Sequence, residues 1–234
     1  MNDKITADIS EIFSSIQGEG IFLGAKQVFV RFYKCNLACA YCDEKRAGSK
    51  SYLPEDLFNE VKFLELSKGP HHSISLTGGE PLLYAEFLKI FLKMVKKEHM
   101  KTYLETNGTL PQELTEIIDL IDIIAMDFKL PSSTGQRDFW KEHAEFLSIG
   151  AKKKIFVKAV VTAETKEEDI DKAISLVRLA KGSVPLVLQP ATPVTPHDKP
   201  IAHNRLMEFV EMGLKNKVEN IRVIPQIHKI LNIK

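Results

Sequence analysis

Three cysteines lie close together in this chain of 234 residues, and it has no others. Cys35, Cys39 and Cys42 have the spacing C-x3-C-x2-C. A disulfide framework would spread an even number of cysteines along the chain. A structural zinc ion normally takes four protein ligands, so a histidine would have to complete that site. Three thiolates in one short loop can also wrap a soft metal cluster that leaves one position open for a small molecule. The cysteines therefore indicate metal binding or catalysis.

A glycine-rich segment follows a short β-branched run, SISLT at 73–77. Its residues are Gly78, Gly79, Glu80 and Pro81. Glycine lets the backbone approach a ligand closely, and exposed carbonyl and carboxylate oxygens can hold a cationic amino group. On its own this segment is equally typical of a tight turn.

The elements that position these residues alternate between strand and helix. We expect strands at 27–33, 73–77, 101–106, 122–128, 154–162, 185–189 and 219–224, and helices at 84–99, from Pro111, and near 136–149, 166–181 and 203–217. Such alternation predicts an α/β fold: a parallel sheet with outer helices, either open or curled toward a barrel. In both forms ligands bind at the C-terminal ends of the strands. That edge would carry the cysteines, the glycine segment, Glu105–Thr109, Asp127, Lys129 and Gln189.

Composition limits the functional class. The net charge is +1 and 44% of residues are hydrophobic, which indicates a globular chain without a field for nucleic acid or anionic lipid. The sequence has neither the ~20 apolar residues of a membrane span nor the start of a signal peptide. We expect one domain over residues 1–234, located in the cytoplasm.

The C-x3-C-x2-C spacing is the signature of the radical S-adenosylmethionine (SAM) superfamily, and Leu76–Pro81 resembles the second motif of that superfamily. The resemblance implies one 4Fe-4S cluster per subunit, held by Cys35, Cys39 and Cys42. Its open iron would bind the amino and carboxylate groups of SAM. Reduction would then cleave SAM to a 5′-deoxyadenosyl radical.

Three further segments, at 13–20, 29–37 and 222–229, are similar to the 7-carboxy-7-deazaguanine synthase family, and the similarity covers essentially the whole chain. It implies an abbreviated, partial (β/α) radical SAM barrel that forms a homodimer. The expected reaction converts 6-carboxy-5,6,7,8-tetrahydropterin to 7-carboxy-7-deazaguanine and releases ammonia, on the route to queuosine and other 7-deazapurines. A flavodoxin or ferredoxin would supply the electron.

The resemblance also assigns residues, with a cluster-binding loop at 34–44 and a substrate loop at 14–20. Arg31 can grip a carboxylate with two hydrogen bonds. Gln17 and Glu19 suit the aminopyrimidinone edge of a pterin. Residues Ile16, Gly18, Thr106 and Lys234, the last through its α-carboxylate, complete the expected substrate set. The expected SAM set is Tyr41, Asp43, Gly78, Gly79, Glu80, Gly108, Asp127, Phe128, Lys129, Gln189 and Thr192.

Two departures from the family pattern affect these assignments. The family commonly has Ser-Pro-Lys where this chain has Asp127-Phe128-Lys129. It usually has Asp-Thr after the third cysteine, with the threonine on Mg²⁺, whereas this chain has Asp43-Glu44. Because Mg²⁺ prefers oxygen ligands, we expect Glu44 to bind it. The competing expectation is that Glu44 pairs with a lysine or arginine and that metal dependence is weak.

Two other functions fit part of the sequence. A glycyl-radical-enzyme activase would share the cysteine spacing but act on a protein. A non-catalytic Fe-S or zinc protein for binding or electron transfer would not need the glycine-rich and polar segments at 78–81 and 105–109. The segments at 17–20 and 225–229 favour the enzyme that acts on a small pterin.

Overall fold

The computed structural model describes residues 4–43, 48–180, 182–193 and 199–233. They form one nine-stranded sheet in the order β3-β1-β2-β4-β5-β6-β7-β8-β9. The strands are β1 (Ala7–Ile16), β2 (Lys26–Phe32), β3 (Lys50–Tyr52), β4 (Ser73–Gly78), β5 (Thr102–Thr106), β6 (Ile123–Phe128), β7 (Lys154–Val161), β8 (Leu186–Pro190) and β9 (Ile221–Val223). The sheet is open, because β3 and β9 are edges that do not pair with each other.

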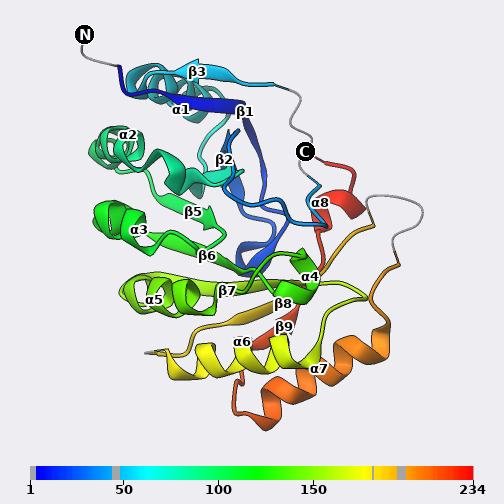
Figure 1. Cartoon of the computed structure of the whole chain (residues 1–234). Coiled ribbons are helices and arrows are strands. Elements are labelled where there is room, and N and C mark those ends of the chain that lie inside the picture. The colour runs from blue at the N-terminus through cyan, green and yellow to red at the C-terminus, as the bar shows by residue number, and fades with distance from the viewer. Residues whose placement is uncertain (1–3, 44–47, 181, 194–198, 234) are drawn as a thin grey trace.

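Long helices cover one face of this sheet, as Figure 1 shows. The α-helices are α1 (Pro54–Lys68), α2 (Ala85–Lys97), α3 (Pro111–Ile117), α4 (Pro131–Thr134), α5 (Trp140–Gly150), α6 (Glu167–Leu179), α7 (His203–Lys215) and α8 (Ile227–Ile230). Three short 3₁₀ helices are η1 (Gly20–Phe22), η2 (Pro81–Tyr84) and η3 (Ile118–Leu120). Helix α8 lies away from the long helices, near the C-terminal ends of the strands (Figure 1).

The parallel part of the sheet runs without interruption from β2 to β9. The expectation of parallel strands and outer helices is therefore confirmed for this part. Strand β1 is different: it pairs antiparallel with β2 on one side and with β3 on the other. Residues 14–16 of the predicted substrate loop belong to β1, so the loop itself begins at Gln17.

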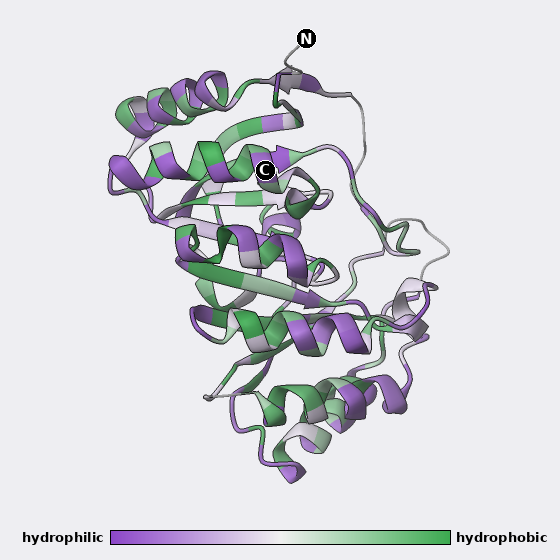
Figure 2. Cartoon of the chain, turned by 60° about the vertical axis from the view of Figure 1, so that its left-hand side comes forward, coloured by the Kyte–Doolittle hydropathy of each residue, from purple (hydrophilic) through white to green (hydrophobic). Residues whose placement is uncertain are grey.

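Each parallel strand presents one apolar and one more polar face. On β4, Ile74 and Leu76 belong to the main hydrophobic core. Ser73, Ser75 and Thr77 alternate with them and so point to the opposite, inner face. Figure 2 shows strands that are largely hydrophobic but become hydrophilic near their arrowheads. The inner face is therefore free to hold polar chemistry at the C-terminal ends of the strands.

A second, smaller hydrophobic cluster fills the inner face near the N-terminal ends of the strands. It contains Tyr103, Ile123, Ala125, Phe156 and Val187, with Ile21 and Phe22 from η1 packed against it. The Phe22 ring meets Tyr103 edge to face, with 5.6 Å between centroids. This apolar floor confines the open part of the inner face to the opposite end.

Strand β1 is tied to the end of helix α1 by a chain of hydrogen bonds. Ser14 Oγ lies 2.7 Å from His71 Nε2, and His71 Nδ1 lies 2.5 Å from Glu65 Oε2. The His71 side chain is 2% exposed. These contacts fix the antiparallel strand beside the parallel sheet.

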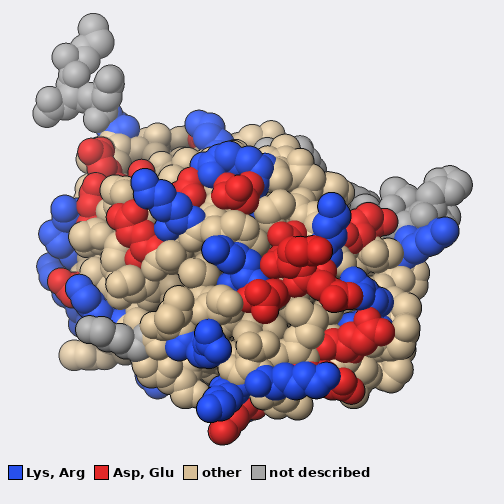
Figure 3. Space-filling model, turned by 60° about the horizontal axis from the view of Figure 1, so that its bottom comes forward, with Lys and Arg blue, Asp and Glu red and all other residues tan. Residues whose placement is uncertain are grey.

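The surface mixes charges of both signs. In Figure 3 the blue lysines and arginines are interspersed with red aspartates and glutamates, in keeping with the net charge of +1. No helix within the described residues is both long and apolar enough to cross a membrane.

Candidate active site

One cavity lies above the apolar floor, at the C-terminal ends of the strands. Its wall brings together most of the residues that the sequence assigned to a site: Ile16, Gln17, Gly18, Glu19, Arg31, Cys35, Cys39, Tyr41, Cys42, Asp43, Gly78, Gly79, Thr106, Asp127, Lys129, Gln189 and Thr192. Glu80, Gly108 and Phe128, which the sequence also assigned to SAM, are not among the residues that line it. Glu44 and Lys234 lie outside the described residues.

The three cysteines enter this cavity from an irregular loop between β2 and β3. The loop is held by two backbone hydrogen bonds, from Cys42 N to Cys39 O at 3.1 Å and from Ala40 N to Thr134 O at 2.9 Å. Burial, with smaller contributions from Asp127 and the other two cysteines, raises the pKa of Cys39 to about 11, although the Lys129 ammonium opposes the rise. Three thiolates gathered here therefore need compensating positive charge.

Metal binding would supply that charge. Among the described residues, no three His, Cys, Asp or Glu side chains are close enough to share a single metal ion. All three cysteines nevertheless line the same cavity. Iron–sulfur clusters bind several thiolates through separate irons, so the donor set fits such a cluster.

The cluster-binding loop is fastened to the turn after β5. Asn36 Nδ2 donates to Thr109 Oγ1 at 2.9 Å, and Asn107 Nδ2 donates to Asn36 Oδ1 at 2.8 Å. His143 supports the same turn from below, with Nε2 3.1 Å from Asn107 O. Its ring stacks on Phe128 at 4.9 Å, and burial lowers the pKa of His143 to about 4. His143 is thus a core histidine, and Phe128 packs against it in the core.

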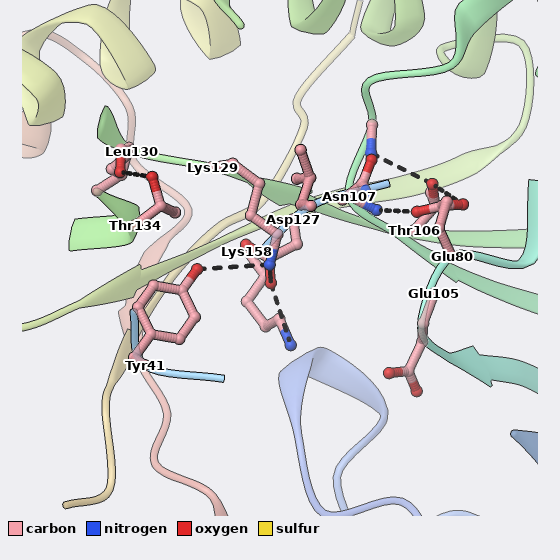
Figure 4. Close-up of polar contacts among 12 residues, drawn as sticks. Tyr41, Glu80, Glu105, Thr106, Asn107, Asp127, Lys129, Leu130, Thr134 and Lys158 are labelled. Carbon is pink, nitrogen blue, oxygen red and sulfur yellow. Dashed lines mark hydrogen bonds and ion pairs between the residues drawn. The ribbon is translucent and has the colours of Figure 1, made fainter. Parts of the chain in front are cut away.

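Glu80 also supports this turn and is fully buried. Its Oε1 accepts from Leu82 N at 3.0 Å and Thr106 Oγ1 at 2.9 Å, and its Oε2 accepts from Asn107 N at 2.7 Å (Figure 4). Burial raises the pKa of Glu80 to about 7, although these three donors oppose the rise. Glu80 therefore braces the end of β5 against the end of β4.

The glycines before Glu80 allow two backbones to touch. A Cβ atom on Gly78 would lie 2.4 Å from Phe32 O, and one on Gly79 would lie 2.0 Å from Lys34 O. Gly78 also has φ +107°, which favours glycine. The segment leading to Cys35 can therefore lie directly against the end of β4.

Glu105 is an acidic residue of the cavity that the sequence placed at this edge of the sheet without giving it a role in binding. Its Oε1 accepts from Gln17 Nε2 at 2.8 Å, and its Oε2 accepts from Thr77 Oγ1 at 3.1 Å. Gln17 Nε2 also donates to Gln27 Oε1 at 3.0 Å, while Gln17 Oε1 accepts from Glu19 N at 3.0 Å. Both amide ends of Gln17 are thus used within the protein, and Glu105 lines the cavity beside it.

Two stacked phenylalanine rings form part of the cavity wall, and an arginine lies beside them. Phe13 and Phe29 stack with 5.1 Å between centroids. The Arg31 guanidinium lies 5.8 Å from the Phe13 ring centre, and its Nε is 3.4 Å from Glu11 Oε2. This combination suits a flat heterocycle that carries a carboxylate.

A row of alternating charges crosses the cavity from the substrate loop to the cluster-binding loop. Lys158 Nζ lies 2.5 Å from Glu19 Oε2 and 3.7 Å from Asp127 Oδ2. Lys129 Nζ lies 2.9 Å from the same Asp127 oxygen and 3.4 Å from Tyr41 Oη. Figure 4 shows the two lysines on either side of Asp127. The aspartate that replaces the family's serine is therefore balanced by two cations.

These contacts set the charge of each group. Burial alone would raise the pKa of Glu19, but the Lys158 ammonium holds it at about 2. Burial would lower the pKa of Lys158, yet Glu19 and Asp127 raise it. The pKa of Lys129 is raised for the same reason, mainly by Asp127. All three groups are ionised at neutral pH.

Residues near the C-terminus close the rim. Ile227 N donates to Gly18 O at 2.9 Å, and Gln226 Nε2 donates to Glu19 Oε1 at 2.8 Å and Asp43 Oδ2 at 3.4 Å. Lys229 forms an ion pair with Asp43. Segment 226–229 thus bridges the substrate loop and the cluster-binding loop.

Sequence comparison gives the same picture over most of the chain. A sequence model of the radical SAM superfamily matches residues 29–177. The chain is 37% identical to 7-carboxy-7-deazaguanine synthase of Geobacter sulfurreducens, over 97% of this chain and 98% of that protein. It is 34% identical to the Thermococcus kodakarensis protein of the same name, over 96% and 98%.

Solved structures share the fold. The crystal structure of QueE from Escherichia coli has a TM-score of 0.64 at 19% identity and covers 95% of each chain. Streptococcus suis SuiB bound to S-adenosylmethionine has a TM-score of 0.60 at 19% identity, over 82% of this chain and 48% of that one. The open, mostly parallel sheet is therefore a radical SAM architecture.

Proposed function

Because the chain belongs to the radical SAM superfamily, and within it to the 7-carboxy-7-deazaguanine synthase family, we propose which residues of its cavity carry the reaction of that family. The protein is a carbon–nitrogen lyase that converts 6-carboxy-5,6,7,8-tetrahydropterin to 7-carboxy-7-deazaguanine with release of ammonia. Its cofactors are a 4Fe-4S cluster, SAM and Mg²⁺. The co-location of three cysteines, a cation and an aromatic wall in one cavity is the observation on which the assignment of roles rests.

Cys35, Cys39 and Cys42 hold the cluster in this proposal. When bound, the cluster and SAM supply hydrogen-atom abstraction by a 5′-deoxyadenosyl radical. Asp127 and Gln189 are acceptors for the ribose or amino groups of SAM, since each has a buried oxygen without a hydrogen-bond partner among the described residues. The backbones of Gly78 and Gly79 line the same part of the cavity.

On the substrate side, Arg31 binds the pterin carboxylate and the Phe13–Phe29 pair packs against the ring. Glu105 accepts hydrogen bonds from the aminopyrimidinone edge, because a carboxylate presents acceptors to the N–H donors found there. Gln17 fixes the orientation of Glu105 rather than donating to the pterin. Glu19 and Thr106 complete the walls of this pocket.

Glu44 binds Mg²⁺ in this proposal, since its carboxylate is a hard oxygen ligand. Asp43 beside it is engaged by Gln226 and Lys229, which leaves Glu44 as the acidic ligand of that pair. Turnover should therefore require Mg²⁺. Activity that a chelator leaves unchanged, with the iron content intact, would remove this role.

Two partners belong to the same proposal. The substrate is a small molecule and the electron comes from an external reductant. We assign that role to a low-potential flavodoxin or ferredoxin in the cytoplasm, and expect the enzyme to act as a homodimer.

The decisive experiment uses protein reconstituted anaerobically with iron and sulfide. With dithionite, SAM and the carboxypterin, we expect 5′-deoxyadenosine and 7-carboxy-7-deazaguanine together. Arg31→Met should raise KM for the pterin much more than KM for SAM, whereas Arg222→Met, an exposed arginine on β9, should change neither. Deoxyadenosine formed without consumption of pterin would contradict the assigned substrate.

A further inference from the structure

We propose that Lys158 is a positioning residue that couples binding of the pterin to binding of SAM. The proposal rests on the function assigned above, because it treats Glu19 as part of the substrate pocket and Asp127 as part of the SAM pocket. The Lys158 ammonium forms ion pairs with both of these carboxylates.

The ammonium of Lys158 is the bridge between the two pockets. Its Nζ lies 2.5 Å from Glu19 Oε2 on the substrate loop and 3.7 Å from Asp127 Oδ2 at the end of β6. The side chains of Lys158 and Asp127 are each 13% exposed, and that of Glu19 is 17% exposed. Little water screens the bridge, so its interactions are strong compared with those of a surface pair.

The charges of the four side chains in this row cancel only when all four are present. Glu19 and Asp127 supply two negative charges, and Lys158 and Lys129 supply two positive charges. Lys129 is already held by Asp127 and Tyr41, so it cannot replace Lys158 beside Glu19. Loss of the Lys158 ammonium would take away the ion-pair partner of the buried Glu19 carboxylate, which costs stability.

This arrangement links the binding of the two ligands, because each ligand fixes side chains that also serve the other pocket. A pterin that binds at Glu19 fixes that carboxylate and, through Lys158, fixes Asp127 Oδ2. Asp127 Oδ1, which is buried and unpartnered among the described residues, is then held ready for SAM. Because coupling between two binding sites is reciprocal, SAM must favour pterin binding by the same factor.

The position of Lys158 on β7 explains why its side chain enters the cavity. On β7, Phe156, Lys158 and Val160 all line the cavity, while Val157 and Ala159 belong to the core on the helix side. Lys154 begins the same strand and, by the same alternation, the same face, but it is exposed and lies over the Phe22 ring at the apolar floor. Lys154 is therefore a matched control for the removal of a lysine.

The test measures equilibrium binding of SAM to the cluster-loaded enzyme, without reductant, in the presence and absence of carboxypterin. For the wild type and Lys154→Met we expect the pterin to tighten SAM binding about fivefold or more. In Lys158→Met this factor should fall to about one. Lys158→Arg keeps the charge and should restore part of it.

A second variant covers the case in which Lys158→Met does not fold. Lys158→Met combined with Glu19→Gln removes the ammonium together with the carboxylate that it pairs with, and leaves Asp127 paired with Lys129. This variant should fold and also show no coupling. A folded variant of either kind that retains the wild-type factor would overturn the proposal. A wild type that shows no coupling would overturn it as well.

Failure of the proposed function gives a different result. In that case the wild type would release no 7-carboxy-7-deazaguanine under reducing conditions, whatever the binding experiment shows. A second readout follows turnover: Lys158→Met should form more 5′-deoxyadenosine per product than the wild type, because SAM would be cleaved without an ordered pterin.

Discussion

Glu80 shows how a single buried carboxylate can shape a site that it does not face. It joins the segment after β4 to the end of β5 by accepting from Thr106 Oγ1 and Asn107 N, and it also accepts from Leu82 N in its own segment. It therefore fixes the positions of Thr106 and Asn107, which line the cavity.

This burial makes stability depend on pH. The pKa of Glu80 is about 7 in the folded protein, against the ordinary value of 4.5. A raised folded pKa means that the folded state binds more protons, so the contribution of this group is complete below pH 4.5 and is lost as pH rises through 7. The difference in unfolding free energy between wild type and Glu80→Gln should decrease over that window, by on the order of 2–3 kcal/mol.

Urea unfolding of the cluster-free protein at several pH values measures this difference. Glu86→Gln, on the first turn of α2, is the control and should show no such dependence. A difference that stays constant from pH 4.5 to 8 would contradict the assignment.

For single residues, the sequence predicted which ones belong to the site better than it predicted which ones contact each other. The cysteines, Arg31 and Asp127 could be placed because motifs and strand ends mark them. Lys158 could not, because a lysine within a β-rich run equally suggests an exposed position. Lys158 alternates along the strand with Phe156 and Val160 and so shares their face. The sequence does not show that this face lines a cavity.

Among the elements, the contact between β4 and the segment after β2 fixes the base of the cluster-binding loop. Gly79 has no positive φ, so alanine there would be resisted by contact with the Lys34 carbonyl and Cys35 N and not by backbone strain. We expect Gly79→Ala to cost roughly 1–3 kcal/mol and to lower the iron bound after reconstitution. Thermal unfolding and iron analysis measure the two effects.

Gly24→Ala is the matched control for backbone strain. Gly24 has φ +84°, but a Cβ there would meet nothing within 4 Å. This variant should lose about 1 kcal/mol and retain its iron. Full iron in Gly79→Ala would show that the loop tolerates a shift.

The segment 226–229 is a second positioning element. Lys229→Ala removes the ion pair to Asp43, which follows Cys42 directly. Since both side chains are partly exposed, we expect KM for SAM to rise roughly two- to fivefold. Lys215→Ala breaks the exposed pair with Glu211 on α7 and should have no effect. An equal change in both variants would exclude a specific role of the segment.

The elements that sequence reasoning missed are β1, β3, α1, α4 and α8. Helix α1 escaped because Phe63 and Leu66 are exposed on it, which blurs the apolar stripe that marks an amphipathic helix. Strand β1 escaped because most of its residues are only half buried. The repeated parallel strands were predictable because both of their ends carry clear signals, apolar runs followed by glycine or polar residues.

For the whole molecule, the cavity wall draws on nearly every strand, from Phe13 on β1 to Gln189 on β8. Ligands should therefore stabilise the entire fold. At about 100 times its Kd, each ligand adds about 2.7 kcal/mol, and each kcal/mol raises Tm by roughly 2–4 °C in a chain of this size. Anaerobic thermal unfolding with SAM alone and with SAM plus carboxypterin measures this. No further rise on addition of the pterin would indicate that it binds elsewhere.

The bridge between Gln226 and Glu19 joins residues that are 207 positions apart. During synthesis the first strands leave the ribosome long before residues 226–229 exist. The rim of the cavity therefore cannot be complete in a nascent chain.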